Sequence, residues 1–305
     1  MKMDTMEKKE YHFSNEIGDA VLTVYEVFPG VQLAYNAVHM DWFDLGSVTQ
    51  GNVIEIHHCR EGRIEQEFHD EYFYLMPGDF SIALRTQRVD AYKFPLRHYH
   101  GIIIGIQEDV AKQWFSQFLE DIHVQPLDVA RKLCGEKNCF VIRSEKYIEH
   151  IFSELYSVPE HMKIGYFKLK ILELFLVLSG IDVSRNQVMT HALPKSQAQL
   201  AKQAAVYLSE HMERHVTISE LSKELSVSQT QLKNIFKTVY GVPVFSYMRI
   251  QKMQQAAQLL IHTERAVAEI AYEFGYNNPG KFSNAFQKIM GETPAEYRKV
   301  HRKQE

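Results

Sequence analysis

Short segments rich in β-branched and aromatic residues follow one another in the first third of the chain, separated by turn residues such as Pro77 and Gly78. They lie at residues 21–28, 53–59, 71–75, 80–84 and 98–106. Runs of this composition are typical of strands, and several in succession are typical of an antiparallel sandwich or barrel. The pattern therefore predicts a strand-rich region over residues 10–106.

From Glu108 onward the apolar residues recur at helical spacing, which predicts helices over residues 107–181. One helix is expected over residues 161–178, and its end is apolar on nearly all sides. Such a helix needs neighbours on more than one side. Two interpretations fit: burial in the core of its own domain, or a seam between two copies of the chain formed by the helices between residues 145 and 178.

The segment 182–196 is polar and predicts a linker, and beyond it nearly every stretch has helical spacing. Hydroxyl or amide side chains followed by Glu, Gln or Pro mark helix starts, and glycines mark helix ends. These signals are Thr217 with Glu220, Ser228 with Gln231, Thr293 with Glu296, Asn278-Pro279, Gly241, Gly275 and Gly291. About seven helices are expected in this part.

A length of 305 residues favours two domains. We expect an α+β protein: an antiparallel β domain with flanking helices over residues 1–181, a linker over 182–196 and an all-α domain over 197–305. After residue 195 the chain has 14 lysines and arginines against 10 glutamates and no aspartate, whereas 20 basic residues stand against 28 acidic ones before it. A basic second part joined to an acidic first part is an asymmetry that nucleic-acid binding would explain.

Three cysteines without a Cys-x-x-Cys pair predict neither a disulfide framework nor a four-cysteine zinc site. The first twenty residues lack the apolar core of a signal peptide, and no apolar run is long enough to span a bilayer. We therefore expect a cytoplasmic protein without a membrane partner.

An internal repeat runs through the second part of the chain at an offset of 49 or 50 residues. Ile218, Glu220, Leu221, Glu224, Leu225, Leu232, Asn234, Phe236 and Gly241 recur as Val267, Glu269, Ile270, Glu273, Phe274, Phe282, Asn284, Phe286 and Gly291. Each copy predicts a short helix, a turn and a second helix, the helix-turn-helix arrangement. The two copies are expected over residues 217–238 and 266–289, joined by one helix over residues 244–260.

The second helix of each copy has an apolar face and a polar face. The apolar face, expected to be buried, consists of Leu232, Ile235, Phe236, Phe282, Ala285 and Phe286. The polar face consists of Gln229, Thr230, Lys233, Asn234, Lys237, Lys281, Asn284, Gln287 and Lys288. Because a helix fits the major groove, where amides and hydroxyls read base edges and lysines read guanine or neutralise phosphates, this face is a candidate DNA reader.

Residues 200–300 closely resemble the DNA-binding domain of the AraC/XylS family of bacterial transcription regulators. The resemblance rests on Leu225-Ser226-Val227-Ser228, Leu232, Phe236-Lys237, Gly241, Arg249, Ala256, Leu260, Ile270-Ala271, Phe274-Gly275-Tyr276, Phe282-Ser283, Phe286, Gly291, Pro294 and Tyr297-Arg298. It implies two reader helices in successive major-groove segments, control of transcription, and RNA polymerase as a partner. Family base-reading positions fall on Thr230, Lys233, Asn234, Lys281, Ser283 and Asn284, with Lys237 and Lys288 nearer the phosphates; with Ser228 and Gln229 these are the expected DNA-binding residues.

Two departures from the family pattern bear on specificity. Asn234 and Asn284 stand where arginine is common, so adenine reading is expected to replace guanine reading. Gly280 removes a side chain at a position that often contacts DNA, so the second reader is expected to be less selective.

The first half resembles, more loosely, the cupin-type sensor domains of such regulators, through Cys59-Arg60-Glu61-Gly62-Arg63, Tyr74-Leu75, Pro77-Gly78-Asp79 and Phe94-Pro95. An effector pocket is expected at Tyr35, Trp42, His57, Arg60, Tyr72 and Tyr74, although core packing alone would also explain the aromatic residues. His57, His58, Cys59, His98 and His100 suit zinc or iron chemically, and alternation places His98 and His100 on one face. The glutamate spacing of a catalytic cupin is absent after them, so neither a metal nor another cofactor is expected.

These observations favour a sequence-specific DNA-binding transcription regulator, not an enzyme, that senses a small molecule and acts as a homodimer on double-stranded DNA. The alternative is a cupin-type metal-dependent enzyme with a helical DNA-binding appendage, but no metal triad or catalytic set is recognisable. A purely architectural DNA protein would not need a strand-rich domain of opposite charge. The identity of the effector, the operator sequence and the direction of regulation do not follow from the sequence.

Overall fold

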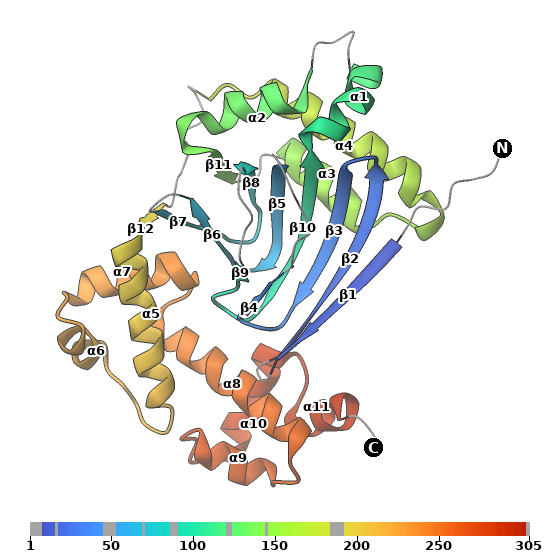
Figure 1. Ribbon diagram of the computed structural model, residues 1–305. Coiled ribbons are helices and arrows are strands. Elements are labelled where there is room, and N and C mark those ends of the chain that lie inside the picture. Colours follow the sequence, from blue (N-terminus) through green and yellow to red (C-terminus); the bar gives the residue numbers. More distant parts are fainter. Residues whose placement is uncertain are drawn as a thin grey trace. The chain divides into compact units, whose positions relative to one another are not determined.

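The computed structural model describes residues 8–15, 18–44, 53–68, 71–85, 91–119, 124–143, 146–183 and 192–302 (Figure 1). The chain divides into two compact units, Met1–Pro194 and Lys195–Glu305. Residue 145 and residues 184–191, which include most of the expected linker, lie outside the described residues.

Two antiparallel sheets form the first unit. The larger has the strand order β1-β2-β3-β10-β5-β8-β11 and the smaller β12-β7-β6-β9-β4. The strands are β1 Lys8–Ser14, β2 Asp19–Phe28, β3 Val31–Val38, β4 Trp42–Phe43, β5 Val53–Gly62, β6 Ile64–Phe68, β7 Glu71–Leu75, β8 Asp79–Arg85, β9 Tyr92–Lys93, β10 Tyr99–Gln107, β11 Cys139–Arg143 and β12 Leu193–Pro194. The five predicted strand segments correspond to β2, β5, β7, β8 and β10, which confirms the antiparallel β architecture.

The larger sheet is covered on both faces, and β10 shows how its alternation produces this. Ile102, Ile104 and Ile106 are buried among the helices on the outer face of the sheet. Tyr99 is buried on the opposite face, where its ring lies 5.3 Å from that of Phe94, next to the smaller sheet. One strand therefore contributes to two apolar layers.

Four helices contribute to the outer layer: α1 Glu108–Leu119, α2 Pro126–Cys134, α3 Lys146–Tyr156 and α4 Lys163–Ser179 (Figure 1). The strand β11 corrects the expectation that residues 107–181 are wholly helical, because it pairs with β8 at the edge of the larger sheet. Its apolar run is short, and periodicity alone does not separate a short strand from a helix segment.

The apolar end of α4 belongs largely to the core of its own unit. Ile171, Leu174 and Phe175 are fully buried, whereas Leu169 and Leu176 are 66% and 49% exposed. The core interpretation is therefore correct for most of the residues that suggested a seam between copies. The exposed large apolar residues described on this helix are Ile164, Leu169 and Leu176, and these remain available for such a contact.

The described residues of the second unit form the expected seven helices: α5 Lys195–Glu210, α6 Ile218–Glu224, α7 Gln229–Tyr240, α8 Val244–His262, α9 Val267–Glu273, α10 Pro279–Met290 and α11 Pro294–His301. The long helix α8 is central, and α5, α7, α9, α10 and α11 all contact it. Across the described parts of both units, no helix is long and apolar enough to cross a membrane.

Candidate nucleic-acid interface

The first helix-turn-helix is formed by α6 and α7. Between them Ser226 has a left-handed backbone (φ 53°), which lets the chain reverse direction in a few residues. Leu221 of α6 and Leu232, Ile235 and Phe236 of α7 are buried. The apolar face predicted for the first copy is therefore correct.

The second helix-turn-helix, α9 and α10, repeats this geometry. Gly275 stands 49 residues after Ser226 and is also left-handed (φ 78°). Phe282 and Phe286 of α10 are fully buried with Ile270 of α9, while Ala285 is only partly buried. Two equivalent units are thus built on two different apolar sets.

Side-chain caps fix where three of these helices, α6, α7 and α10, begin. The backbone N–H of Glu220 donates to Thr217 Oγ1 (3.1 Å), and that of Gln231 donates to Ser228 Oγ (3.1 Å). Asn278 Oδ1 accepts from the N–H groups of Gly280 (2.8 Å) and Lys281 (3.1 Å). Because a cap satisfies otherwise unpaired amides of the first turn, it sets which residues of the reader helix fall on its outer face.

The carboxylate of Glu220 also anchors α6 to the end of α5. Its Oε1 accepts from Arg214 (2.6 Å) and from the Tyr207 hydroxyl (2.9 Å). The hydrogen bond from Arg214, helped by that from Tyr207, lowers the pKa of Glu220 to about 2. The carboxylate is therefore ionised at neutral pH, and its hydrogen bonds connect the first turn of α6 to Tyr207 of α5 and to Arg214 in the loop between the two helices.

Nearly all of the predicted DNA-binding residues lie on the exposed faces of α7 and α10. Those that are exposed are Ser228, Gln229, Thr230, Lys233, Asn234, Lys237, Lys281, Asn284 and Lys288. Ser283 differs, because it is half-buried and its hydroxyl donates to the carbonyl of Pro279 (3.0 Å). Its Oγ proton is therefore already used within α10.

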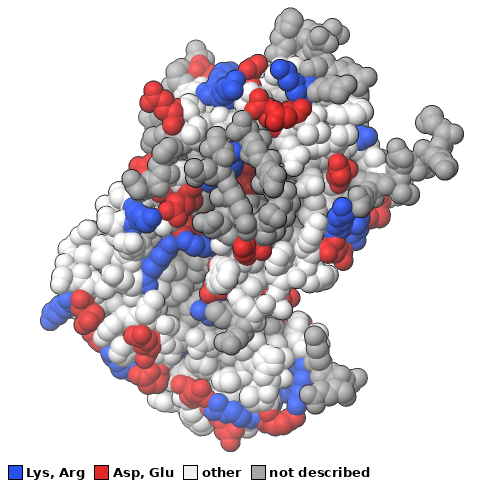
Figure 2. Space-filling view, viewed as in Figure 1, with Lys and Arg blue, Asp and Glu red and all other residues white. Residues whose placement is uncertain are grey.

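The reader helices carry no acidic residue, and their lysines are not neutralised locally. Lys233 and Lys237 on α7, and Lys281 and Lys288 on α10, have no ion pair with any described residue. On the side of the molecule shown in Figure 2, basic and acidic side chains are interspersed. The unpaired lysines of these two helices are the positive charges that favour DNA binding.

The helix α8 holds both copies. Phe236 and Tyr240 of α7 contact the ring of Tyr247 on α8, with centroids 5.3 and 4.4 Å apart. Farther along, Met253, Ala256, Ala257 and Leu260 are buried with the second copy. Lys252 Nζ donates to the carbonyl of Phe274 (2.9 Å), which ends α9. The two reader helices are thus fixed to one continuous helix.

The residues predicted to line an effector pocket are not brought together, which corrects that prediction. Trp42 is 51% exposed and Arg60 extends over the ring of Tyr156. Tyr72 and Tyr74 contact each other on β7 in the smaller sheet, and Tyr74 donates to Glu65 (2.8 Å). His57 instead lies between the two sheets and Tyr35 on the helix-covered face. Alternation along the strands separates residues that the sequence grouped.

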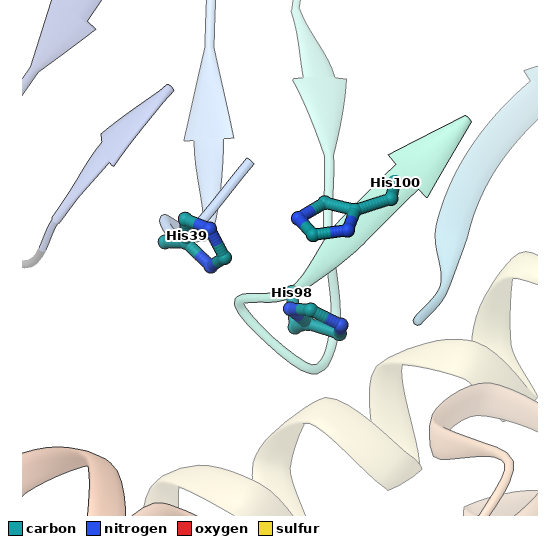
Figure 3. Close-up of side chains that lie close together, drawn as sticks. All are labelled: His39, His98 and His100. Carbon is teal, nitrogen blue, oxygen red and sulfur yellow. The ribbon is translucent and has the colours of Figure 1, made fainter. Parts of the chain in front are cut away.

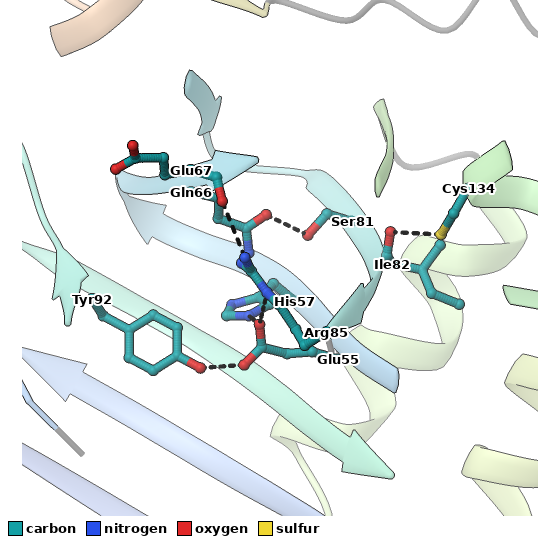
Figure 4. Close-up of polar contacts among 9 residues, drawn as sticks. All are labelled: Glu55, His57, Gln66, Glu67, Ser81, Ile82, Arg85, Tyr92 and Cys134. Carbon is teal, nitrogen blue, oxygen red and sulfur yellow. Dashed lines mark hydrogen bonds and ion pairs between the residues drawn. The ribbon is translucent and has the colours of Figure 1, made fainter. Parts of the chain in front are cut away.

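Polar side chains from both sheets meet around His57 (Figure 4). Glu55 lies 3.2 Å from His57, accepts from Arg85 Nε (3.2 Å) and accepts from the Tyr92 hydroxyl. Burial alone would raise the pKa of Glu55, but His57 and Arg85 outweigh it and hold the pKa well below its usual range. Close by, Ser81 donates to Gln66 Oε1 (3.1 Å).

This interior cluster leaves polar atoms without hydrogen-bond partners among the described residues. Both ring nitrogens of His57 and Nε2 of Gln66 are buried in this way; the 3.2 Å contact of His57 with Glu55 has the distance of a hydrogen bond but not its geometry. Buried polar atoms usually find partners. No local sequence signal marks this cluster, because its members come from four strands, β5, β6, β8 and β9.

A cavity of about 340 Å³ lies on the helix-covered face of the larger sheet. It contains only one of the predicted effector residues, Tyr35, and is lined by Lys8, Thr23, Tyr25, Tyr35, Tyr156, Val158 and Lys163. Lys163 Nζ donates to the Tyr25 hydroxyl (2.9 Å) and pairs with Glu160 (2.7 Å). Lys8 Nζ pairs with Glu10 (2.8 Å), so both ammonium groups of the cavity have carboxylate partners, and the rest of the lining is mostly aromatic.

Comparison with known proteins identifies the second unit. The family model of a helix-turn-helix domain matches residues 221–300. The chain is 34% identical over 108 residues to the uncharacterized HTH-type transcriptional regulator YisR of Bacillus subtilis, covering 35% of this chain and 38% of YisR. It is 26% identical over 233 residues to the arabinose operon regulatory protein of Salmonella typhimurium, covering 75% and 77% of the two chains.

Among solved structures, the C-terminal domain of AraT, a response regulator from Geobacillus stearothermophilus, is 31% identical, with a TM-score of 0.33 over 35% of this chain and 88% of that one. The chain thus spans little more than a third of YisR, whereas it spans about three quarters of the arabinose regulator. The resemblance drawn from residues 200–300 is confirmed: this part of the chain contains a helix-turn-helix domain of the AraC type.

Proposed function

Because its second unit carries a helix-turn-helix domain of the AraC type, we propose that this protein is a sequence-specific DNA-binding transcription regulator. One observation carries the proposal. Two equivalent helices, α7 and α10, each present an asparagine and two unpaired lysines on an exposed face. Asparagine pairs with adenine in the major groove, while lysines neutralise phosphates.

The length of α8 supports simultaneous reading by both helices. Its 19 residues correspond to about 28 Å of helix. Successive major-groove segments on one side of B-DNA are about 34 Å apart. Two readers fixed near opposite ends of such a helix suit one continuous, asymmetric DNA site of roughly 15 to 20 base pairs.

The first unit is proposed to be a sensor for a small molecule. The cavity between β1–β3 and the helices α3 and α4 supports this, because its volume of about 340 Å³ lies within the range of ligand pockets. We further propose a cytoplasmic, non-enzymatic protein that acts as a homodimer and communicates with RNA polymerase; three buried, unpaired cysteines suit a reducing compartment.

Selection from a random DNA library with the full-length protein tests the central proposal. We expect one enriched asymmetric motif, bound with an affinity that falls steeply as salt rises because several lysines displace counterions. Enrichment of no motif, together with salt-independent retention of DNA, would refute the proposal. Repeating the selection with Phe286→Ala, which removes a fully buried residue of the second copy, should leave only the part of the motif read by α7.

A further inference from the structure

Three histidines meet at one end of the larger sheet (Figure 3), and a glutamate from a neighbouring strand lies beside two of them. His39 follows β3, His98 precedes β10 and His100 lies on β10. One ligand nitrogen from each histidine can be chosen so that all three lie within 4.8 Å of one another. Glu61 Oε2 lies 3.6 Å from His98 Nε2 and 3.4 Å from His100 Nδ1.

Strand register brings these residues together. Val38 pairs with Tyr99 across β3 and β10, so His39 falls opposite His98. His98 and His100 share one face of β10 because side chains alternate. On the other side of β10, His100 pairs with Glu61, but Gly101 pairs with Cys59.

Arg60 is therefore an extra residue, a β-bulge, in β5. Without the bulge, Glu61 would share the inward face of Cys59. With it, Glu61 turns to the face that carries His98 and His100. Gly62 follows with a left-handed backbone (φ +77°), and a Cβ there would lie 1.9 Å from the carbonyl oxygen of His98. The chain around Glu61 is thus shaped to approach the histidines.

We propose that His39, His98, His100 and Glu61 bind a divalent transition-metal ion of the zinc class. Imidazole nitrogens and a carboxylate oxygen are ordinary zinc ligands, with bonds of about 2.0–2.2 Å. In a tetrahedron with such bonds the ligand atoms are about 3.4 Å apart. The Glu61–His100 and Glu61–His98 distances already match this spacing. The histidine nitrogens lie within 4.8 Å of one another, so they need to close by about 1.4 Å at most.

The site is accessible to an ion. His98 and His100 are about one-third exposed, which leaves an ion a path from solvent.

These ligands differ from the group that the sequence suggests, in which His98 and His100 stand with His57, His58 and Cys59. In the structure His57 lies between the sheets, and His58 is stacked on Phe152, 4.2 Å between ring centroids. The additional ligands are His39 and Glu61, each supplied by a neighbouring strand.

Metal titration of the full-length protein, purified without a histidine tag and stripped with a chelator, tests the proposal. We expect one Zn²⁺ per chain, measured by competition with a chromophoric chelator, and Co²⁺ should give the intense visible absorption of a tetrahedral site. His98→Gln and His100→Gln should each weaken Zn²⁺ binding by more than about 100-fold, since even second-shell changes cost 10- to 100-fold.

His150→Gln is the matched control. His150 is 65% exposed on α3 and lies 3.4 Å from Glu154, so it is an ordinary surface histidine–carboxylate pair. Binding should be unchanged in this variant, and circular dichroism should confirm that all variants are folded. Glu61→Gln, at a half-exposed position, serves if a histidine variant does not fold, and it should weaken binding and alter the Co²⁺ spectrum. Absence of stoichiometric binding, or equal affinity in His98→Gln and the unmodified protein, would overturn the proposal.

Discussion

Replacement of Asn234 by alanine separates base reading from general attraction to DNA. Asn234 is exposed on α7, two residues after the buried Leu232 and two before the buried Phe236. Its side-chain amide has no hydrogen-bond partner among the described residues. The hydroxyl of Thr238 donates to the backbone carbonyl of Asn234 (3.0 Å) and not to its side chain. Because alanine is the better helix former, Asn234→Ala should not destabilise the fold.

The expected size of the effect follows from the chemistry of one amide. An asparagine that pairs bidentately with adenine contributes about 1–3 kcal/mol of discrimination against other bases. The preference at one base pair should therefore fall by roughly 5- to 150-fold, while preferences elsewhere in the site remain. Asn234 carries no charge, so the dependence of affinity on salt should be nearly unchanged.

Lys237→Ala, one turn farther along α7, should have the opposite signature. Lys237 is exposed and has no ion pair with a described residue. If it neutralises one phosphate, its loss weakens all sequences alike and reduces the slope of log K against log salt by about 0.9. Asn234→Ala is therefore expected to change the base preference at one position, and Lys237→Ala to change the salt dependence of binding.

Affinity measurements on the preferred site and its single-base variants, at several salt concentrations, make the comparison. Gln203→Ala, which removes an exposed amide from α5, and Lys299→Ala, which removes an exposed lysine from α11, are the controls. Both controls should leave the base preferences intact. If Asn234→Ala also preserves every affinity ratio, the assignment of direct base reading to this residue is wrong.

Three further predictions concern the framework of the second unit. Thr217→Ala removes the N-cap of α6 and should lower the free energy of unfolding by about 1 kcal/mol in urea titrations, whereas Thr217→Ser should retain most of it. The hydrogen bond from Arg214 lowers the pKa of Glu220 to about 2, so the contribution of this carboxylate to stability is complete above pH 4.5 and is lost as the pH falls toward 2. In Glu220→Gln this part of the pH dependence of unfolding should disappear, and an unchanged profile would contradict the ion pair. Phe282→Ala empties a fully buried site and should cost about 3–5 kcal/mol, against less than about 1 kcal/mol for the 43% exposed Phe245; equal losses in the two unfolding curves would contradict the core of the second copy.

The predictions that succeeded from the sequence depend on local chemistry. A hydroxyl or amide cap and a glycine stop act within one turn of helix, so Thr217, Ser228 and Gly241 could be interpreted without knowledge of the fold. The repeat added the apolar faces of α7 and α10, because spacing within a helix determines which side chains share a face. The left-handed backbone of Ser226 was not predicted, because glycine, which lacks a Cβ and stands at the equivalent position 275, is the residue that normally signals this conformation.

The first unit has features that no local pattern in the sequence predicts. Which strands pair, and in what register, is decided by contacts between distant segments, so the meeting of His39 with His98 had no local signal. The bulge at Arg60 changes the face of Glu61, and simple alternation would have placed that side chain between the sheets. The expected effector pocket failed for the same reason, because neighbours in the sequence alternate between faces.

Because α8 is continuous, it fixes the distance and the rotation between the two reader helices. The helix runs without interruption from Val244 to His262, and both reader helices are packed against it. Inserting one base pair between the two segments of a binding site moves the second by about 3.4 Å and rotates it by about 36°, and an unbroken helix has no hinge to follow that rotation. We therefore expect a single base substitution in a binding site to reduce affinity far less than the insertion of one base pair between its two segments.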